Sequence, residues 1–204
     1  MFYNVLDKKR QNILPLLSYF KKEFYLAGGT ALALQLGYRS SVDFDYFANK
    51  DIDTDKVLSE IKIVFKGHKI LKVREEENTL IVLIDEGILL SFFGYKYKLI
   101  KSLIKEEYFN LASIEDIGCT KFSAIIGRKS NKDYIDLYYI LQEIKLRELL
   151  ELAGKKFPEI DTNLIIKNLV YFKDIENSPI KFKNNNKITL KEVEKFMKRA
   201  VVLN

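Results

Sequence analysis

Residues 27–47 read AGGTALALQLGYRSSVDFDYF, and this stretch decides how the chain folds. Residues 24–29, which overlap the start of this stretch, read FYLAGG, a pattern typical of a short strand that ends in a glycine turn. TALALQL at 30–36 is rich in strong helix formers, and Gly37 follows as a typical stop signal. VDFDYF at 42–47 alternates polar and apolar residues, which predicts a strand with one buried face. The stretch therefore predicts strand, turn, helix, loop and strand in succession.

Two carboxylates lie on the second of these strands. Asp43 and Asp45 are two residues apart, so their side chains point to the same face, about 6–7 Å apart along the chain. Like charges on one face repel each other unless a positive group lies between them. Mg²⁺ prefers carboxylate oxygens and completes its coordination with substrate phosphates. The pair predicts a magnesium site; an edge strand that carries two aspartates towards water without any function is the alternative.

Two glycines lie between the first strand and the helix. At Gly28 and Gly29, free backbone N–H groups and the helix dipole favour an anion, and the missing side chains let a phosphate approach closely. A simple tight turn is the alternative reading. Taken together with the aspartates, the glycines predict a site that holds phosphate at one end and the neutralising metal at the other.

Composition bounds the class of protein. The chain has 204 residues, of which 48% are hydrophobic, enough for one domain with a buried core. No apolar run approaches the roughly 20 residues that span a bilayer, and the first residues lack a signal-peptide pattern. One cysteine, Cys119, excludes a disulfide framework, and one histidine, His68, excludes a histidine metal cluster. We expect a cytoplasmic protein with no membrane segment.

The net charge of +6 is unevenly distributed. Residues 1–150 hold 23 Lys and Arg against 21 Asp and Glu, whereas residues 151–204 hold 11 against 7. A basic surplus towards one end is compatible with a nucleic-acid footprint. A lysine-rich composition is the alternative, because 28 of the 34 basic residues are Lys.

The rest of the first half predicts helices and strands. Apolar residues at helical spacing predict a helix at 5–22, weakened by Pro15, and a second amphipathic helix at 53–65. Extended runs follow, and the last two flank a likely hairpin turn, DEG. These runs are residues 68–76, 79–84 and 88–95.

The second half predicts helices. Ser113 and Asp116 form a capping box before the first helix, and Asn131 is expected to cap the next. The expected helices cover residues 113–128, 131–143, 145–156, 161–172 and 189–202. We therefore expect an α/β fold of the α+β type. Its mixed-sheet core at 1–112 is flanked by helices, and a helical part at 113–204 packs on that core as one unit.

The segments GGTAL and GYRSSVDFDYF together resemble the G-[GS]…D-x-D signature of the DNA polymerase β-like nucleotidyltransferase superfamily. They are more closely similar to the AbiEii family of nucleotidyltransferase-like toxins, from bacterial type IV toxin–antitoxin and abortive-infection systems. LASIEDIGCTKFSAIIGRKSNKDYIDLYYIL at 111–141 resembles a second block of that family. The resemblance covers roughly residues 20–145. It implies a nucleotidyltransferase-type mixed sheet and in-line attack of an acceptor hydroxyl on the α-phosphorus of an NTP.

The resemblance also implies roles for the residues of the first block. Gly28, Gly29 and Thr30 would cradle the triphosphate, and Asp43 and Asp45 would bind Mg²⁺. In the loop before the aspartates, Arg39 would either contact phosphate or pair with Asp43 or another acid nearby.

In the second block, Lys121 matches the family's functional lysine and would meet a phosphate, with Arg128 two turns later on the same side. The alternative is an exposed lysine that extends its ammonium group into water. Asp133 and Asp136 are neighbours on one helix, and one or both would reach the active site, as a base or as partner for Lys121. Asp133 also lies in the first helical turn, where an acid interacts well with the helix dipole.

One departure from the superfamily pattern concerns the third carboxylate. Its expected position on the neighbouring strand is Ser91, and Asp85 on the preceding turn is expected to point elsewhere. A neutral hydroxyl cannot replace a carboxylate as a magnesium ligand or as a comparable base. Three alternatives remain: Asp43 and Asp45 suffice for one metal, Asp136 compensates from the helix, or the protein binds nucleotide without turning it over.

Two functions follow from the resemblance. The first is an Mg²⁺-dependent nucleotidyltransferase toxin that transfers a nucleotide from an NTP to an acceptor such as the tRNA 3′ end, and that has a cognate antitoxin. The second is a catalytically impaired module that acts through GTP, antitoxin or nucleic-acid binding, favoured by Ser91. A nucleotidyltransferase that modifies small molecules such as antibiotics is a further, weaker alternative.

Overall fold

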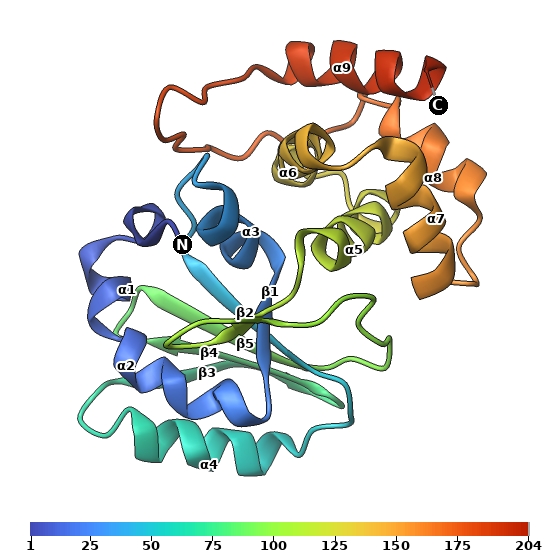
Figure 1. The fold of residues 1–204 in the computed structure, drawn as a ribbon. Helices are drawn as coiled ribbons and strands as arrows, with labels where there is room; N and C mark the ends of the chain where they lie inside the picture. The colour runs from blue at the N-terminus through green and yellow to red at the C-terminus, as the bar shows by residue number, and fades with distance from the viewer. Residues whose placement is uncertain (204) are drawn as a thin grey trace.

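The computed structural model of the protein describes residues 1–203, and its centre is a seven-stranded mixed sheet (Figure 1). The strands are β1 (Tyr25–Ala27), β2 (Asp43–Ala48), β3 (Ile70–Glu76), β4 (Thr79–Ile84), β5 (Ile88–Gly94), β6 (Ile104–Lys105) and β7 (Asn110–Leu111). Their order is β3-β4-β5-β2-β1-β7-β6. Strand β2 runs parallel to β5 and antiparallel to β1. The expected α/β class with a mixed sheet is confirmed.

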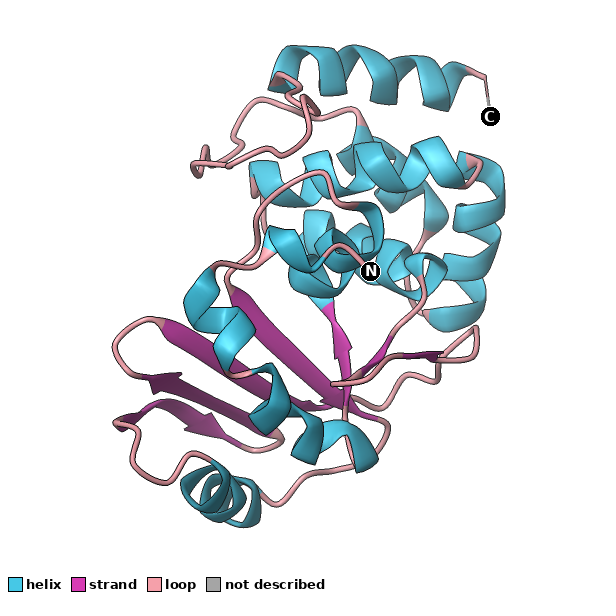
Figure 2. Ribbon diagram, turned by 60° about the vertical axis from the view of Figure 1, so that its left-hand side comes forward, coloured by secondary structure: helices cyan, strands magenta, loops and turns pink. Residues whose placement is uncertain are grey.

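The helices surround the sheet in two groups (Figure 1, Figure 2). They are α1 (Lys8–Asn12), α2 (Leu14–Leu17), α3 (Gly28–Leu36), α4 (Thr54–Val64), α5 (Ile114–Gly127), α6 (Asn131–Glu143), α7 (Leu146–Lys156), α8 (Thr162–Leu169) and α9 (Leu190–Val202), with 3₁₀ turns η1 (Tyr3–Val5) and η2 (Ser18–Lys22). Helices α1, α2 and α4 lie near the strands, whereas α5 to α9 form a helical part beyond α3. Within residues 1–203, no helix is both long and apolar enough to cross a membrane.

Strand β2 has one buried face and one face that carries carboxylates. Phe44 and Tyr46 are fully buried, and the Tyr46 ring stacks on Phe92 of β5 with 5.1 Å between ring centroids. Asp43 and Asp45 alternate with these residues and are only partly buried. Because side chains alternate along a strand, aromatic packing on one face fixes both carboxylates on the other.

The N-terminal segment is more broken than its hydrophobic spacing suggests. The single helix expected at 5–22 is wrong, because the segment divides into η1, α1, α2 and η2. Asp7 caps α1 by accepting from the Arg10 main-chain N–H at 2.9 Å. Pro15 lies in the first turn of α2, where its missing N–H is tolerated. In a continuous helix Pro15 could not donate to the preceding turn, so the chain begins a new helix there.

The cap of α6 also differs from expectation. Ser130 is the N-cap residue, and the expected cap, Asn131, is the first residue of the helix. The Asn131 side chain instead binds residues 177 and 178, which lie much later in the sequence. Its amide donates to the Asn177 side chain and to the Ser178 carbonyl, both at 2.9 Å. The polar residue was recognised, but its partner lies 47 residues away and leaves no local sequence signal.

Helix α8 and two short strands depart from the expected boundaries. Helix α8 is shorter than the helix expected at 161–172. The Tyr134 hydroxyl donates to the Asn168 carbonyl at 2.9 Å and so satisfies an acceptor near the C-terminus of α8.

Strands β6 and β7 were not expected, because two residues are too few to show a hydrophobic period. They extend the sheet through pairing of Leu26 with Leu111.

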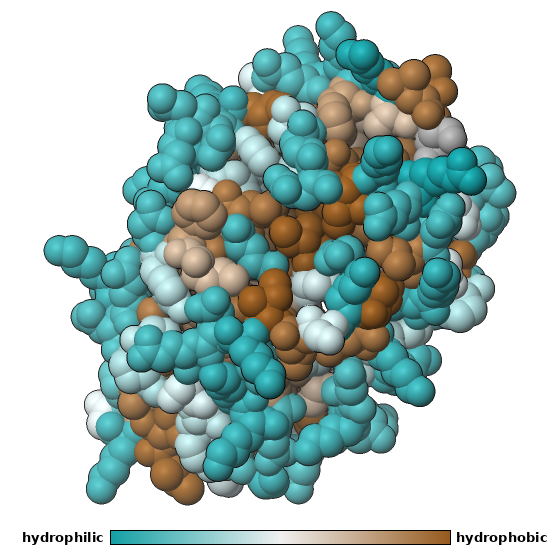
Figure 3. Space-filling view, in the orientation of Figure 1, coloured by the Kyte–Doolittle hydropathy of each residue, from teal (hydrophilic) through white to brown (hydrophobic). Residues whose placement is uncertain are grey.

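A single cluster of buried apolar side chains extends from Val5 to Met197 on α9. Figure 3 shows one face of the molecule, where apolar side chains gather towards the middle and polar ones cover most of the periphery. The core therefore continues from the sheet into the helical part. The division into 1–112 and 113–204 stays a prediction.

A buried ion pair joins helices of the second half to the chain that leaves the sheet. The Lys156 ammonium on α7 lies 2.7 Å from the Asp116 carboxylate on α5, and both side chains are almost fully buried. Asp116 also accepts from the main-chain N–H groups of Ile100 and Lys101. Ser113 caps α5 as expected, and the Asp116 carboxylate also lies 3.1 Å from the Ser113 hydroxyl. Asp116 thereby fixes α5, α7 and the loop after β5.

Substituting Asp116 by Ala should destabilise the fold by about 3–5 kcal/mol, because it leaves the Lys156 charge buried without its partner. Urea unfolding at neutral pH measures this free energy directly. Glu115→Ala, at the preceding and less buried position of α5, is the matched control and should cost less than about 1 kcal/mol. Equal losses in the two variants would contradict this role of Asp116.

Candidate active site

A cleft of about 570 Å³ lies where the start of β2 faces α5 and α6. Residues of α3, β2, β5, α5 and α6 line it, and part of the segment 176–186 completes its wall. This segment, here called the strap, connects α8 to α9 and passes α6 and α3 (Figure 1). The volume lies in the range typical of small-molecule sites. The lining contains all of the residues expected at the site except Gly28 and Asp136.

Close contacts with other side chains require glycine at both Gly28 and Gly29, the first two residues of α3. Gly28 has a φ of +69°, which favours glycine, and a Cβ atom there would lie 2.7 Å from the Asp45 carboxylate. A Cβ atom on Gly29 would clash with the Arg39 guanidinium. No side chain within residues 1–203 caps the N-terminus of α3, which follows Ala27. The start of α3 therefore offers main-chain donors and the positive end of a helix dipole beside Asp45.

The pairing of β2 with β5 fixes which residue of β5 lies beside each of the two aspartates. Asp43 pairs with Leu89, and Asp45 pairs with Ser91, which confirms that Ser91 is adjacent on the neighbouring strand. Burial raises the pKa of Asp45, and the nearby Asp43 raises it further, whereas the Ser91 hydroxyl and the cations across the cleft oppose the rise. The carboxylates are thus close enough to repel each other.

Asp136 is the centre of a fully buried ion cluster. Arg39 binds its carboxylate with two N–H donors, at 2.8 and 2.9 Å. The Lys121 ammonium lies 2.6 Å from the second carboxylate oxygen, and the Tyr38 hydroxyl donates to the first. Burial disfavours the charge of Asp136, but Arg39 and Lys121 outweigh it and hold the pKa of Asp136 well below its usual range. The carboxylate is ionised and fully satisfied.

Asp133 extends this cluster towards the mouth of the cleft. Its carboxylate lies 2.7 Å from the Lys121 ammonium, and Arg128 donates to both of its oxygens at 2.8 and 3.1 Å. Lys121 therefore bridges Asp133 and Asp136. Burial works against the charge of Lys121, but the two carboxylates raise its pKa. The alternative of a water-exposed Lys121 is wrong, because the side chain is only 7% exposed.

The structure shows the partners of three side chains that were expected at the site. Asp136 cannot compensate for a missing metal ligand, because it is fully buried between Arg39 and Lys121. Of the alternatives for Arg39, the structure shows pairing with an acid other than Asp43, namely Asp136. The Thr30 hydroxyl hydrogen-bonds with the protein itself, donating to the Asp43 carbonyl and lying 2.7 Å from the Ser41 hydroxyl. Thr30 thus holds the loop before β2 in place.

Several residues of the site left no recognisable signal in the sequence. Tyr38 binds Asp136 from the loop after α3, and Arg10 donates to the Val42 carbonyl immediately before Asp43. These contacts join residues 98 and 32 positions apart, respectively. Such pairings follow from the fold and not from local pattern. Among residues 1–203, no group of three or more acidic, His or Cys side chains could hold a metal.

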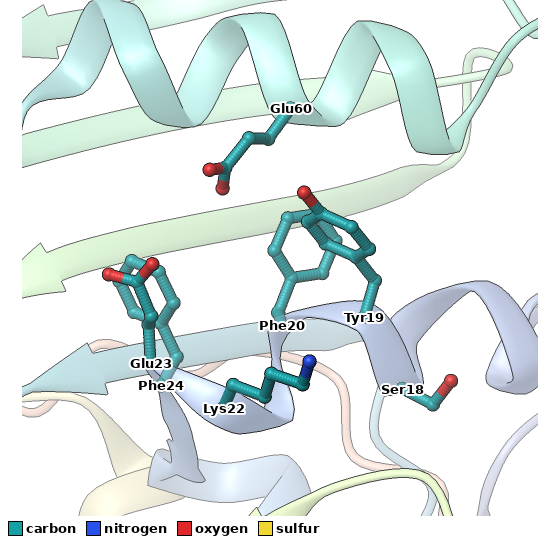
Figure 4. A pocket seen from close by; sticks show the side chains of 7 residues that line it. All are labelled: Ser18, Tyr19, Phe20, Lys22, Glu23, Phe24 and Glu60. Carbon is teal, nitrogen blue, oxygen red and sulfur yellow. The ribbon is translucent and has the colours of Figure 1, made fainter.

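A smaller pocket of about 200 Å³ lies between η2 and α4 and shares no lining residue with the cleft (Figure 4). Phe20 and Phe24 line it beside Glu60 and Glu23. Glu23 is neutralised by two lysines, at 2.7 and 3.2 Å. Because its charges are balanced at the surface, this pocket lacks the concentrated charge seen in the cleft.

Known proteins resemble this chain in sequence and in fold. The family model described as nucleotidyl transferase AbiEii toxin, Type IV TA system, matches residues 16–201. An uncharacterised protein of Aquifex aeolicus (strain VF5) is 38% identical over 185 residues, covering 88% of this chain and 86% of the relative.

Two solved structures show a similar fold. MenT4, a nucleotidyltransferase toxin of Mycobacterium tuberculosis H37Rv, has a TM-score of 0.61 at 15% identity, covering 95% of this chain and 80% of its own. JHP933 of Helicobacter pylori has a TM-score of 0.59 at 16% identity, covering 97% and 92%. At these identities the likeness concerns the fold.

The ion cluster predicts an acid-sensitive contribution to stability. The pKa of Asp136 is lower in the folded than in the unfolded protein, so its contribution is complete above the unfolded pKa and is lost as the pH falls. In Asp136→Asn, the free energy of unfolding should therefore fall less steeply between about pH 5 and pH 2 than in the unmodified protein.

Urea unfolding across this pH range measures both slopes. Asp174→Asn removes a carboxylate that is 67% exposed and paired with Lys129, and this control should leave the slope nearly unchanged. An Asp136→Asn slope equal to that of the unmodified protein would show that the cluster does not stabilise the ionised carboxylate.

Proposed function

Because the chain belongs to the AbiEii family of nucleotidyl transferase toxins of type IV toxin–antitoxin systems, it is a nucleotidyltransferase, and we propose that the cleft is its active site. One observation carries this proposal: Asp43 and Asp45 face the cleft directly beside the uncapped start of α3. Carboxylates beside main-chain donors are the arrangement that a metal-bound polyphosphate requires.

The two aspartates fit a hard divalent cation such as Mg²⁺. They are oxygen ligands on one face of β2, they repel each other, and Gly28 leaves the space beside Asp45 free of a side chain. Two carboxylates with substrate phosphates are a usual donor set for Mg²⁺. When bound, the ion would neutralise phosphate charge and polarise the α-phosphoryl group. Ser91 adds no charge, so Asp43 and Asp45 are the proposed metal ligands.

The remaining residues position and stabilise the phosphates. The start of α3 at Gly28 and Gly29 binds triphosphate oxygens, and Lys121 and Arg128 supply positive charge across the cleft. An acceptor hydroxyl oxygen bonds to the α-phosphorus, the bond from that phosphorus to the bridging oxygen breaks, and pyrophosphate leaves. The hydroxyl proton passes to solvent water, because Ser91 provides no carboxylate to receive it. Asp133 and Asp136 act as positioning residues for the cations.

The proposed acceptor is a nucleic-acid hydroxyl, with the tRNA 3′ end as the first candidate. The basic surplus of residues 151–204 supports this choice, because phosphate backbones bind clustered Lys and Arg. A type IV toxin implies a cognate antitoxin, which we propose as the protein partner of this chain. NTPs are the proposed nucleotide donors.

A second candidate function follows from Ser91. The residue paired with Asp45 on β5 is a serine, so the cleft could bind nucleotide without efficient transfer. A ligand that binds the native state raises its melting temperature. Mg²⁺-dependent thermal stabilisation by an NTP, without release of pyrophosphate, would favour this nucleotide-binding module.

Substituting Asp43 or Asp45 by Asn should reduce nucleotide transfer by at least about a hundredfold, because each change removes a charge at the phosphate site. The assay incubates protein, Mg²⁺ and total bacterial tRNA with each α-labelled NTP in turn. Asp51→Asn, an exposed carboxylate beyond the end of β2, is the control and should retain activity. Full activity in the Asp43→Asn and Asp45→Asn proteins would place the chemistry elsewhere.

A further inference from the structure

A row of leucines crosses the sheet from Asp43 to its free edge at β3. Leu89 of β5 pairs with Asp43, Leu83 of β4 pairs with Leu89, and Leu71 of β3 pairs with Leu83. Residues paired across strands point to the same face, and Ile81 lies on that face two positions before Leu83. Neighbouring strands lie about 4.8 Å apart, so the row is about 14 Å long. These three leucines and Ile81 are called the outer face here.

The outer face is accessible to a partner. Leu71 is 56% exposed, and Ile81, Leu83 and Leu89 are partly exposed. Within residues 1–203, none of the four packs against the core cluster. Leu89 also lines the cleft, so the outer face is continuous with the candidate active site. Single exposed apolar residues are normal at a protein surface, whereas a contiguous apolar patch marks an interaction site.

The opposite face of the same strands shows what kind of element covers them. There Leu80 and Val82 of β4 are buried, and α4 packs on β3 and β4 with Val57 and Ile61 buried. Figure 1 shows α4 on the far side of the strands from α3. Strand β4 reads TLIVLI, a continuous apolar run that is typical of strands covered on both faces. The sequence of β4 therefore fits a second apolar layer on the outer face.

The free edge at β3 favours contact with the face over addition of a strand. The register of β3 and β4 shifts between Lys72 and Arg74, which marks a bulge or a similar irregularity. Arg74 donates to the Glu76 carboxylate at 2.8 and 2.7 Å. Irregular, charged edges discourage pairing with another strand. Because Arg74 and Glu76 neutralise each other, this rim of the outer face carries no net charge.

The inner end of the outer face is negative. The cations of the buried cluster pair with Asp133 and Asp136. Asp43 and Asp45, by contrast, form no ion pair with any residue between 1 and 203, and they repel each other. The outer face is thus aliphatic along its length and acidic at one end. A nucleic-acid backbone does not fit it, because such binding requires clustered cations and stacking aromatic rings.

We propose that the outer face binds an amphipathic helix of a protein partner, with aliphatic side chains towards the leucine row and a Lys or Arg at the end that meets Asp43 and Asp45. Such a helix complements the face both in hydrophobicity and in charge. The inference needs the charges of the two aspartates but no nucleotide transfer, so it stands apart from the proposed function. A helix docked there lies against the open side of the cleft and restricts access to it.

The test uses a labelled peptide of about 14 residues, which spans about 21 Å as a helix, with Leu along one face and Lys elsewhere. Fluorescence anisotropy measures its binding to the whole protein. Leu71→Asn and Leu83→Thr should each weaken binding about tenfold, because each removes aliphatic surface from the contact. Ile63→Asn is the matched control and should bind normally, since Ile63 is 72% exposed but lies on α4.

A second peptide, with Glu in place of every Lys, tests the charge at Asp43 and Asp45. It should bind at least about tenfold more weakly than the Lys peptide, because the two carboxylates repel it. The net charge of +6 on the whole chain favours the opposite order, so non-specific attraction cannot produce this result. Equal or tighter binding of the Glu peptide would overturn the proposal.

Other outcomes would also overturn it. These are failure of the Lys peptide to bind at millimolar concentration, and equal weakening in the Ile63→Asn protein. Light scattering tests for a second copy, because a dimer that Leu71→Asn dissociates would place another molecule of this chain on the outer face. Loss of binding to a labelled RNA oligonucleotide in Leu71→Asn would assign the face to nucleic acid instead. Thermal unfolding of each variant checks that the fold is intact.

Discussion

The site depends on one buried carboxylate, that of Asp136. Arg39 reaches it from the loop between α3 and β2, and Lys121 reaches it from α5. With Asp136 itself on α6, the contact joins the loop before β2 to helices α5 and α6. Without this carboxylate the Arg39 charge would be buried without an acidic partner and Lys121 would keep only Asp133, and an unpaired buried charge is strongly destabilising. The relative position of the aspartate strand and the cationic wall therefore rests on this one group.

The buried ion cluster of Asp136, Arg39 and Lys121 contributes more to the geometry of the site than to the stability of the fold. Removing several charges from water costs free energy that ion pairing only partly recovers, and apolar residues of similar size often stabilise a core as well. The two-point contact between Arg39 and Asp136 has a defined orientation that apolar packing lacks. It also explains Gly29, because the Arg39 guanidinium occupies the space that a Cβ atom would need. The glycine pair thus serves the protein's own packing as well as access to an anion.

Local pattern was sufficient for most of the sheet and for the first block of the site. Alternation on β2 predicted the shared face of Asp43 and Asp45, whereas the position of Ser91 on the neighbouring strand was implied only by the family resemblance. Local sequence pattern could not predict which oppositely charged side chain pairs with each charged residue of the site. Asp136 and Arg39 are 97 residues apart, so only the assembled fold shows that this carboxylate is enclosed. The strap likewise shows no hydrophobic periodicity, because contacts with distant loops fix its position.

The serine beside Asp45 changes the charge balance of the cleft. A third carboxylate on β5 would add negative charge where a polyanion must bind, and would require more metal charge to offset it. With Ser91 there, the charged groups that line the cleft are four carboxylates and five cations: Asp43, Asp45, Asp133 and Glu176 against Arg39, Lys121, Arg128, Lys132 and Lys181. The same substitution removes a base from the acceptor side of the site. We therefore expect nucleotide binding to tolerate Ser91 better than catalysis does, because binding depends on net charge whereas proton removal depends on one group at one position.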